Sequence, residues 1–327
     1  MHKALSNELG GIRSAGDCCK PMAHIAVKNA PAPVIALKQP KLLELLCSPN
    51  HKSEEPLRLA GNELIGAGWR VPIVNGIPDF VTYAPKMKRS MEIEIPIEAV
   101  PQAEILGHPP NSGDRPHWFQ EAGFKYPLLQ SHAKGFLLDV GAGQGNRRTF
   151  ANLGYDYIPL DISFNSQQSK LGAADIDIVA DCHRLPIRSR SVEAVNCSAV
   201  LEHLYCPPVA MQEIGRILKP GGLLVGSCSF LEGEHFDSQQ HYSYLGLFRL
   251  LECNGFKVIC LFPGESLWES HAGSIFLGLP AKKLLGRLHR RLYLSFVKLM
   301  GNEPPERRLL RHAAVLYFAA AKPSNPE

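Results

Sequence analysis

Hydrophobic and polar positions follow two different periods between about residue 116 and residue 262. Short apolar runs suited to buried strands are separated by stretches whose apolar residues recur every three or four positions, as on one face of a helix. The expected strands are Phe136 to Val140, Tyr157 to Leu160, Ile176 to Ala180, Ala194 to Ser198, Leu223 to Ser227, Phe256 to Leu261 and, near the end of the chain, His312 to Ala321. The expected helices are an amphipathic one before Phe136, one from about Gln144, Pro208 to Leu218 and Tyr244 to Cys253. This alternation predicts an α/β domain with a parallel sheet and helices on both faces.

The first 115 residues keep neither period for long. A short helical run, Leu42 to Leu46, precedes an extended segment from Arg70 to Phe80 that prolines interrupt, and Met91 to Pro96 alternates like an edge strand. Residues 1–38 mix Gly, Ser, Lys and Pro without helix or strand periodicity. We therefore expect four segments: a flexible leader (1–38), a small β-rich module (39–84), a connector (85–115) and a large domain (116–323).

Composition narrows the class of protein only slightly. The 327 residues are 45% hydrophobic and 20% charged, which is ordinary for a globular protein. A net charge of +4 is too small to indicate a nucleic-acid partner, so none is expected. The nine cysteines are odd in number and several lie in apolar runs, which favours reduced thiols. With no signal peptide and no run of about 20 apolar residues, the expected location is the cytoplasm.

A glycine-rich loop carries the strongest local signal. In Leu137-Leu-Asp-Val-Gly-Ala-Gly-Gln-Gly-Asn146 an apolar strand runs into three glycines and then into a helix, whose first amides can bind a polar ligand. This arrangement resembles the first motif of class I S-adenosylmethionine (SAM)-dependent methyltransferases, rather than the Gly-x-Gly-x-x-Gly of NAD enzymes. The resemblance implies a Rossmann-like seven-stranded sheet, SAM as cofactor, and a loop under the methionine part of SAM that Asp139 orders.

Further motifs of the same family follow in order. Asp161 lies about 20 residues past the loop, where a carboxylate can accept the ribose hydroxyls. The segment from Asp181 to Ser191 resembles the family's D-x-x-x-L-P-F motif, which implies that Asp181 accepts the adenine amino group. Ser198 to Leu204 is similar to its LEH signature, and Glu213 to Gly222 to its Pro-Gly-Gly turn. The cofactor-binding residues expected from these motifs are Asp139, Gly141, Ala142, Gly143, Gly145, Asp161, Ile162, Asp181, Cys182 and Ser198.

The acceptor of the methyl group is less well marked. Methyl transfer from SAM is an in-line displacement, and a hydroxyl acceptor would benefit from a base such as histidine. We expect His203 and His241 as catalytic candidates, although His203 could equally orient the loop that follows it. The stretch from His235 to Tyr244 resembles the H-x-Y-R-Y-T element of bacterial methyltransferases that are often encoded with glycan and lipid biosynthesis functions. Ser243 replaces the arginine of that element and Leu245 its threonine.

A basic amphipathic segment within 281–311 has three interpretations. Leu284, Leu288, Leu292 and Phe296 share one face of a helix that lysines and arginines otherwise surround. The helix could close over the acceptor pocket, or residues 281–300 could contact an anionic membrane surface. The simplest alternative is a helix packed on the sheet with a solvated basic face.

The N-terminal module resembles a small zinc-ribbon domain that activates certain methyltransferases. The run Leu42-Leu-Glu-Leu-Leu-Cys47 and the segment Val71 to Phe80 carry that resemblance. Only Cys47 and His51 fall in the first metal-binding knuckle, and two ligands cannot complete a tetrahedral zinc site. We therefore expect the module to lack zinc, and no metal site elsewhere.

Three functions are compatible with the sequence. The first is a methyltransferase acting on a small molecule, a glycan or a lipid-linked acceptor, most simply at a hydroxyl. The second is an RNA or protein methyltransferase, against which Asn196-Cys-Ser-Ala stands where amino-methylating enzymes carry an Asn-Pro-Pro-Tyr-like motif. The third is a SAM-binding protein that regulates without transferring methyl groups.

Overall fold

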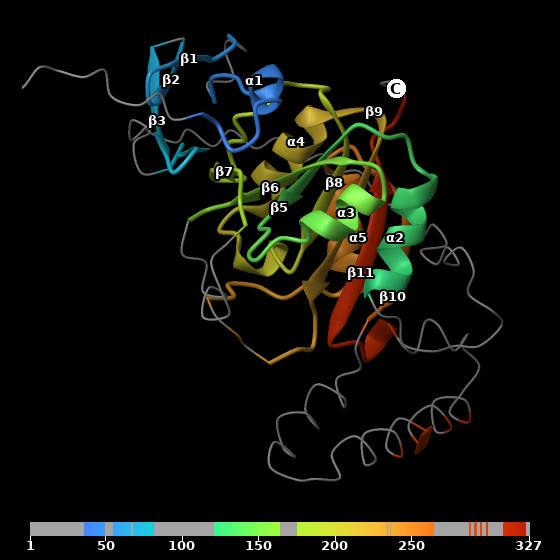
Figure 1. The fold of residues 1–327 in the computed structure, drawn as a ribbon. Coiled ribbons are helices and arrows are strands. Elements are labelled where there is room, and N and C mark those ends of the chain that lie inside the picture. The colour runs from blue at the N-terminus through green and yellow to red at the C-terminus, as the bar shows by residue number, and fades with distance from the viewer. Residues whose placement is uncertain are drawn as a thin grey trace, which may run out of the picture. The chain divides into compact units, whose positions relative to one another are not determined.

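The computed structural model of the chain describes residues 36–49, 55–66, 68–81, 121–163, 175–233, 235, 237–264 and 310–324, with five further residues of a helix between 288 and 299. Within this part of the chain it contains a four-stranded and a seven-stranded sheet (Figure 1). The expected α/β class is confirmed.

Helices and strands alternate along the large domain. The strands are β5 (Phe136–Val140), β6 (Asp156–Asp161), β7 (Ile178–Val179), β8 (Val192–Ser198), β9 (Leu218–Ser229), β10 (Lys257–Pro263) and β11 (Val315–Ala321). The helices are α2 (Glu121–Ser131), α3 (Arg147–Asn152), the short 3-10 helix η2 (Leu201–His203), α4 (Pro207–Ile217) and α5 (Tyr244–Glu252).

The strand order of the large sheet is β10-β11-β9-β8-β5-β6-β7. β5 pairs in parallel with both β6 and β8, whereas β11 runs antiparallel to its neighbours β9 and β10. β6 and β7 therefore lie in sequence on one side of β5. The chain then crosses over, and β8 pairs with the other side of β5. In parallel sheets, ligands bind at the carboxyl ends of the strands where the order reverses. Here that point lies between β5 and β8.

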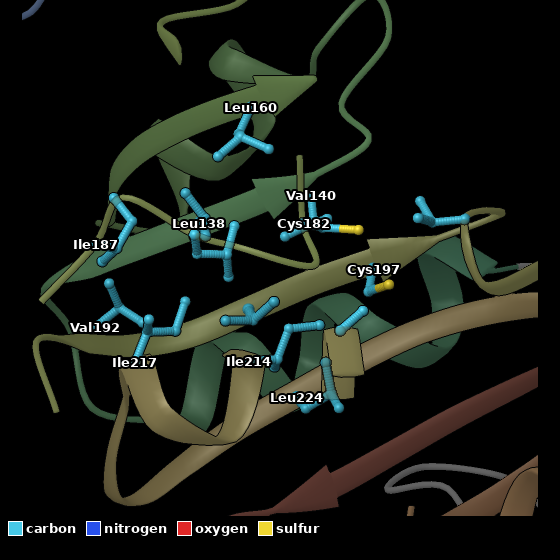
Figure 2. Close-up of a cluster of buried hydrophobic side chains, with 14 of the residues drawn as sticks. Leu138, Val140, Leu160, Cys182, Ile187, Val192, Cys197, Ile214, Ile217 and Leu224 are labelled. Atoms are coloured by element: carbon cyan, nitrogen blue, oxygen red, sulfur yellow. The ribbon is translucent and has the colours of Figure 1, made fainter. Parts of the chain in front are cut away.

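The two faces of the sheet bury separate clusters of side chains. Alternate residues of a strand point to opposite faces, and Leu137 accordingly joins one cluster while Leu138 joins the other. The cluster around Leu137 includes residues of α2 and α3, and the cluster around Leu138 includes residues of α4 and α5. Figure 2 shows Ile214 and Ile217 of α4 facing the second cluster. Helices thus cover both faces, as the alternation of elements predicts.

The N-terminal segment contributes to the same hydrophobic core. It comprises α1 (Leu42–Leu45) and an antiparallel sheet of β1 (Arg58–Ala60), β2 (Glu63–Gly66), β3 (Trp69–Val74) and β4 (Ile77–Pro78). The amide of Cys47 donates to Pro186 O at 3.1 Å, and the amide of Phe80 donates to Val179 O at 2.8 Å. Leu46 and Trp69 belong to the cluster that includes Leu138. This segment is therefore packed into the large domain.

Several element boundaries differ from the expected ones. β9 begins at Leu218 rather than Leu223, because Leu218 pairs with Val192 before a shift in register. α3 begins at Arg147 rather than near Gln144, since the glycine loop occupies the intervening residues. β11 begins at Val315 rather than His312.

Some expectations lie largely or wholly outside the described residues. These are the leader, the Met91 to Pro96 strand, His51 and most of the basic segment. Within the basic segment Leu288 and Leu292 are helical and exposed. Among the helices described, none combines the length and the apolar character that crossing a membrane requires.

Candidate functional site

The glycine loop leaves β5 in a backbone conformation that suits glycine. Gly141 and Gly143 have φ values of 68° and 55°. Both values lie in the left-handed region that other residues rarely occupy. A Cβ atom on Gly141 would also overlap the side chain of Val200, which follows β8. The loop and the carboxyl end of β8 therefore approach more closely than any larger residue would allow.

Asp161 at the end of β6 fixes the loop from the other side. One carboxylate oxygen accepts the amide of Gly143 at 2.9 Å, and the other accepts the amide of Ile162 at 2.7 Å. The amide of Ala142 donates to Leu160 O at 3.0 Å. The side chain of Asp161 is only 7% exposed, but it lines a cavity. The loop is thus held in place by the residue that faces the cavity beside it.

Asp139 lies behind the loop, in a buried hydrogen-bond network. Its carboxylate accepts the Tyr157 hydroxyl and the Asn196 side-chain amide, both at 2.5 Å. The Tyr157 oxygen in turn accepts the amide of Asn146, the residue just before α3. Burial and the neighbouring Asp139 charge raise the pKa of Tyr157. Asp139 therefore connects three strands of the sheet to the start of α3.

Asp181 and His183 form a second polar pair, after β7. His183 Nδ1 lies 2.5 Å from an Asp181 carboxylate oxygen, and His183 Nε2 accepts the amide of Cys206 at 3.3 Å. Because an amide can only donate, Nε2 carries the lone pair and Nδ1 carries the proton. The imidazole stacks on Tyr205, with ring centroids 3.8 Å apart. Both ring nitrogens are occupied, so His183 holds Asp181 in one orientation.

The glycine loop, Asp161, Asp181 and His183 border a cavity of about 670 Å³ at the carboxyl ends of β5, β6 and β8. Its volume falls in the range typical of small-molecule sites. Of the residues expected from sequence, the following line it: Gly141, Gly143, Asp161, Ile162, Asp181, Cys182 and His203. The following do not form its wall: Asp139, Ala142, Gly145, Ser198 and His241. The cavity thus gathers residues from four separate motifs.

Five polar wall residues were not expected from the sequence: Ser163, His183, Tyr205, Asp237 and Gln239. His183 is adjacent to the expected Asp181-Cys182 pair, and Tyr205 follows the LEH signature. Both positions could have been found from their place in those motifs. Asp237 and Gln239 come from the loop after β9, whose contacts depend on the tertiary fold.

That loop is held against η2 by hydrogen bonds. The amide of Gln239 donates to Glu202 O at 2.7 Å, and the Gln240 side-chain amide donates to Leu204 O at 2.7 Å. As a result the His235 ring lies across the His203 ring, with centroids 5.4 Å apart at 89°. The ring centroid of His241 lies 6.4 Å from that of His235. Of the two expected catalytic histidines, only His203 reaches the cavity wall.

Cys182 is expected to be inert toward alkylating reagents, although it lines the cavity. Burial, followed by the nearby Asp181 charge, raises the pKa of its thiol to about 12, so the reactive thiolate is scarce at neutral pH. Mass spectrometry after brief iodoacetamide treatment of native protein should find Cys182 unmodified, and denatured protein should be modified there. Rapid labelling of native Cys182 would contradict this environment.

Comparison with known proteins identifies the central segment. Residues 138–226 match the family model described as a methyltransferase domain. A demethylmenaquinone methyltransferase from Renibacterium salmoninarum is 38% identical over 92 residues, which are 27% of this chain and 39% of that protein. An uncharacterized chloroplastic methyltransferase from Arabidopsis thaliana is 31% identical over 198 residues, covering 50% of this chain and 54% of that protein. The chain thus spans about half or less of these relatives.

Among solved structures, a phosphoethanolamine N-methyltransferase 2 from Haemonchus contortus, in complex with S-adenosylhomocysteine, is similar over 61% of this chain and 52% of that one. The TM-score is 0.39 and the identity 16%. A likeness this distant says nothing about the acceptor.

Proposed function

We propose that this chain, which belongs to the class I SAM-dependent methyltransferases, binds SAM in the cavity beside the glycine loop and transfers its methyl group to a small-molecule acceptor. The observation that carries the proposal is the meeting of Gly143, Asp161 and Asp181 on one cavity wall. This wall lies at the point of the sheet where ligands are expected.

The residues of the cavity fit the groups of SAM. Asp161 presents a buried carboxylate, which suits the ribose hydroxyls. Asp181 is held by His183 and suits the adenine amino group. Because Gly141 and Gly143 lack side chains, the loop backbone can lie directly against the methionine part. SAM supplies a methyl group on a positively charged sulfur, and the remaining task of the protein is to align the acceptor and to exclude water.

We assign the acceptor to the part of the cavity beside His203, Tyr205 and Gln239. Two histidines line the wall, but both ring nitrogens of His183 already have partners. His203 is therefore the preferred base, which would take the proton of an acceptor hydroxyl as the methyl group is transferred. His241 is not a wall residue and is the weaker candidate. The named relative from Renibacterium makes the reduced, hydroquinone form of a quinone of the demethylmenaquinone kind the first acceptor to test, because that form carries the hydroxyl from which the base takes a proton.

Transfer of labelled methyl from SAM to chemically reduced demethylmenaquinone and to a panel of phenols tests the proposal. Wild-type protein should label at least one acceptor, and His203→Ala should reduce the rate by about 100-fold or more, as expected for loss of a general base. His132→Ala is the matched control, because His132 bonds to Glu193 O and does not line the cavity. A wild-type protein that binds SAM but labels no acceptor would favour the regulatory alternative.

A further inference from the structure

A cluster of imidazole and carboxylate groups lies beside the cavity. Glu202, His203 and His235 each offer one ligand atom, and these three atoms lie within 4.8 Å of one another. Glu202 and His203 belong to η2, and His235 belongs to the loop after β9. The hydrogen bonds between this loop and η2 hold the two segments together. The grouping is therefore held by hydrogen bonds that do not use the three candidate ligand side chains.

Glu202 is the member that points to a bound cation. Its side chain is 1% exposed, and Oε1 accepts the Ser229 hydroxyl at 2.9 Å. Oε2 is buried, and no described residue forms a hydrogen bond with it. A buried carboxylate oxygen has lost its water and is rarely left without a donor or a metal ion. A cation bound at Glu202 Oε2 would therefore stabilise this buried carboxylate.

The charges around Glu202 are also unbalanced. The Ser229 hydroxyl lies 2.9 Å from a carboxylate oxygen of Glu232 as well, and its one hydrogen can serve only one of the two acidic groups at a time. In the part of the chain described, neither Glu202 nor Glu232 forms an ion pair with a lysine or an arginine. A divalent cation would balance both carboxylates.

His235 has the hydrogen bond typical of a metal-binding histidine. Its Nδ1 lies 3.1 Å from Gly233 O, and a carbonyl can only accept, so the neutral ring carries its proton on Nδ1. The lone pair is then on Nε2, the atom we expect to bind. Histidines that bind metals commonly donate their other ring N–H to a carbonyl in this way, which fixes the ring orientation.

We propose that Glu202, His203 and His235 bind a divalent transition-metal ion, with Zn²⁺ as the representative. Two imidazoles and one carboxylate form an established donor set for zinc and leave a fourth position for water or for an acceptor oxygen. Zn–N bonds of about 2.1 Å place neighbouring ligand atoms roughly 3.4 Å apart, so small side-chain rotations would close the site. The perpendicular His203 and His235 rings suit such a geometry.

The other group of potential ligands, Asp181, Cys182 and His183, does not fit a metal ion. Both nitrogens of His183 already have partners, and the Cys182 thiol stays protonated.

At the proposed site, the part that the ion plays in catalysis rests on the proposed function. With the ion bound, His203 is a metal ligand. It then cannot also act as the base that the proposed function assigns to it. Binding of the ion itself does not depend on the proposed function.

Metal content of the full chain tests the proposal without SAM or acceptor. Purified protein is stripped with a chelator, reloaded with Zn²⁺, dialysed and analysed by mass spectrometry, and its affinity is measured against a chromophoric chelator. We expect one tightly held Zn²⁺ per wild-type chain. Glu202→Gln, His203→Ala and His235→Ala should each weaken binding by about 100-fold, and Co²⁺ substitution should give a four-coordinate spectrum.

Two variants serve as controls. His132→Ala should bind like wild type, because His132 contacts Glu193 O instead. Cys47→Ser tests binding at the N-terminal module and should also bind like wild type. Loss of zinc only in Cys47→Ser, unchanged affinity in folded His235→Ala, or less than about one fifth of an equivalent bound by wild type would each overturn the proposal. If Glu202→Gln fails to fold, the two histidine variants decide.

Discussion

Replacing Asp161 with alanine should weaken binding of S-adenosylhomocysteine by about 100-fold or more. The substitution removes a buried carboxylate that we assign to the ribose, and it leaves the amides of Gly143 and Ile162 without their acceptor. A hydrogen bond to a charged group contributes about 1.5–3 kcal/mol. Losing the bonds from both ribose hydroxyls to this carboxylate therefore accounts for a weakening of about 100-fold or more. The expected readout is the loss of the ligand-induced rise in melting temperature that wild type shows.

Asp156→Ala is the matched control for that substitution. Asp156 begins the same strand that Asp161 ends, and its half-exposed carboxylate pairs with Lys41 at 2.7 Å. An exposed ion pair contributes little, so ligand binding and stability should stay close to those of wild type. An Asp161→Ala protein whose affinity fell by less than about threefold would show that this carboxylate does not contact the ligand.

Asp139→Ala is expected to have the largest effect on stability. Without the carboxylate, the Tyr157 hydroxyl and the Asn196 amide lose their common acceptor in a buried site. Each unsatisfied group costs about 1–3 kcal/mol of folding free energy. For the two groups together, this corresponds to a fall in melting temperature of roughly 5–15 °C. Thermal unfolding followed by circular dichroism measures this fall.

A double-mutant cycle separates the network from the mere loss of a charge. Tyr157→Phe removes the hydroxyl that bonds to Asp139 and accepts from the Asn146 amide. If the groups act together, Asp139→Ala should cost less in the Tyr157→Phe background than in wild type, because the unsatisfied hydroxyl is already absent. Additive losses, or a loss below about 1 kcal/mol for Asp139→Ala alone, would contradict the network.

The sequence predicts the sheet and the loop because their signals are local. Consecutive apolar residues such as Leu137 and Leu138 indicate a strand that is buried on both faces of a sheet. The two residues do lie in separate buried clusters, and the expected strand is confirmed. Gly141 and Gly143 predict a tight loop because few other residues tolerate their backbone conformation. Expectations of this kind depend on one stretch of chain at a time.

Other features depend on which segments meet, and periodicity does not contain that information. The tautomer of His183 is set by Cys206, which lies 23 residues further along the chain. Arg147 at the start of α3 bonds to both Asp175 and Asp177, an arrangement that no spacing rule predicts. The apolar residues of the N-terminal segment predict burial, but they do not predict that Leu46 would share a cluster with Leu138.

Calorimetric titration of the wild-type protein with S-adenosylhomocysteine tests the central claim, which is that the cavity beside the glycine loop is a SAM site. We predict saturable binding with one ligand per chain, and competition by SAM for the same site. Folded wild-type protein that releases no heat and shows no competition would contradict the account, and would leave the cavity without an assigned ligand.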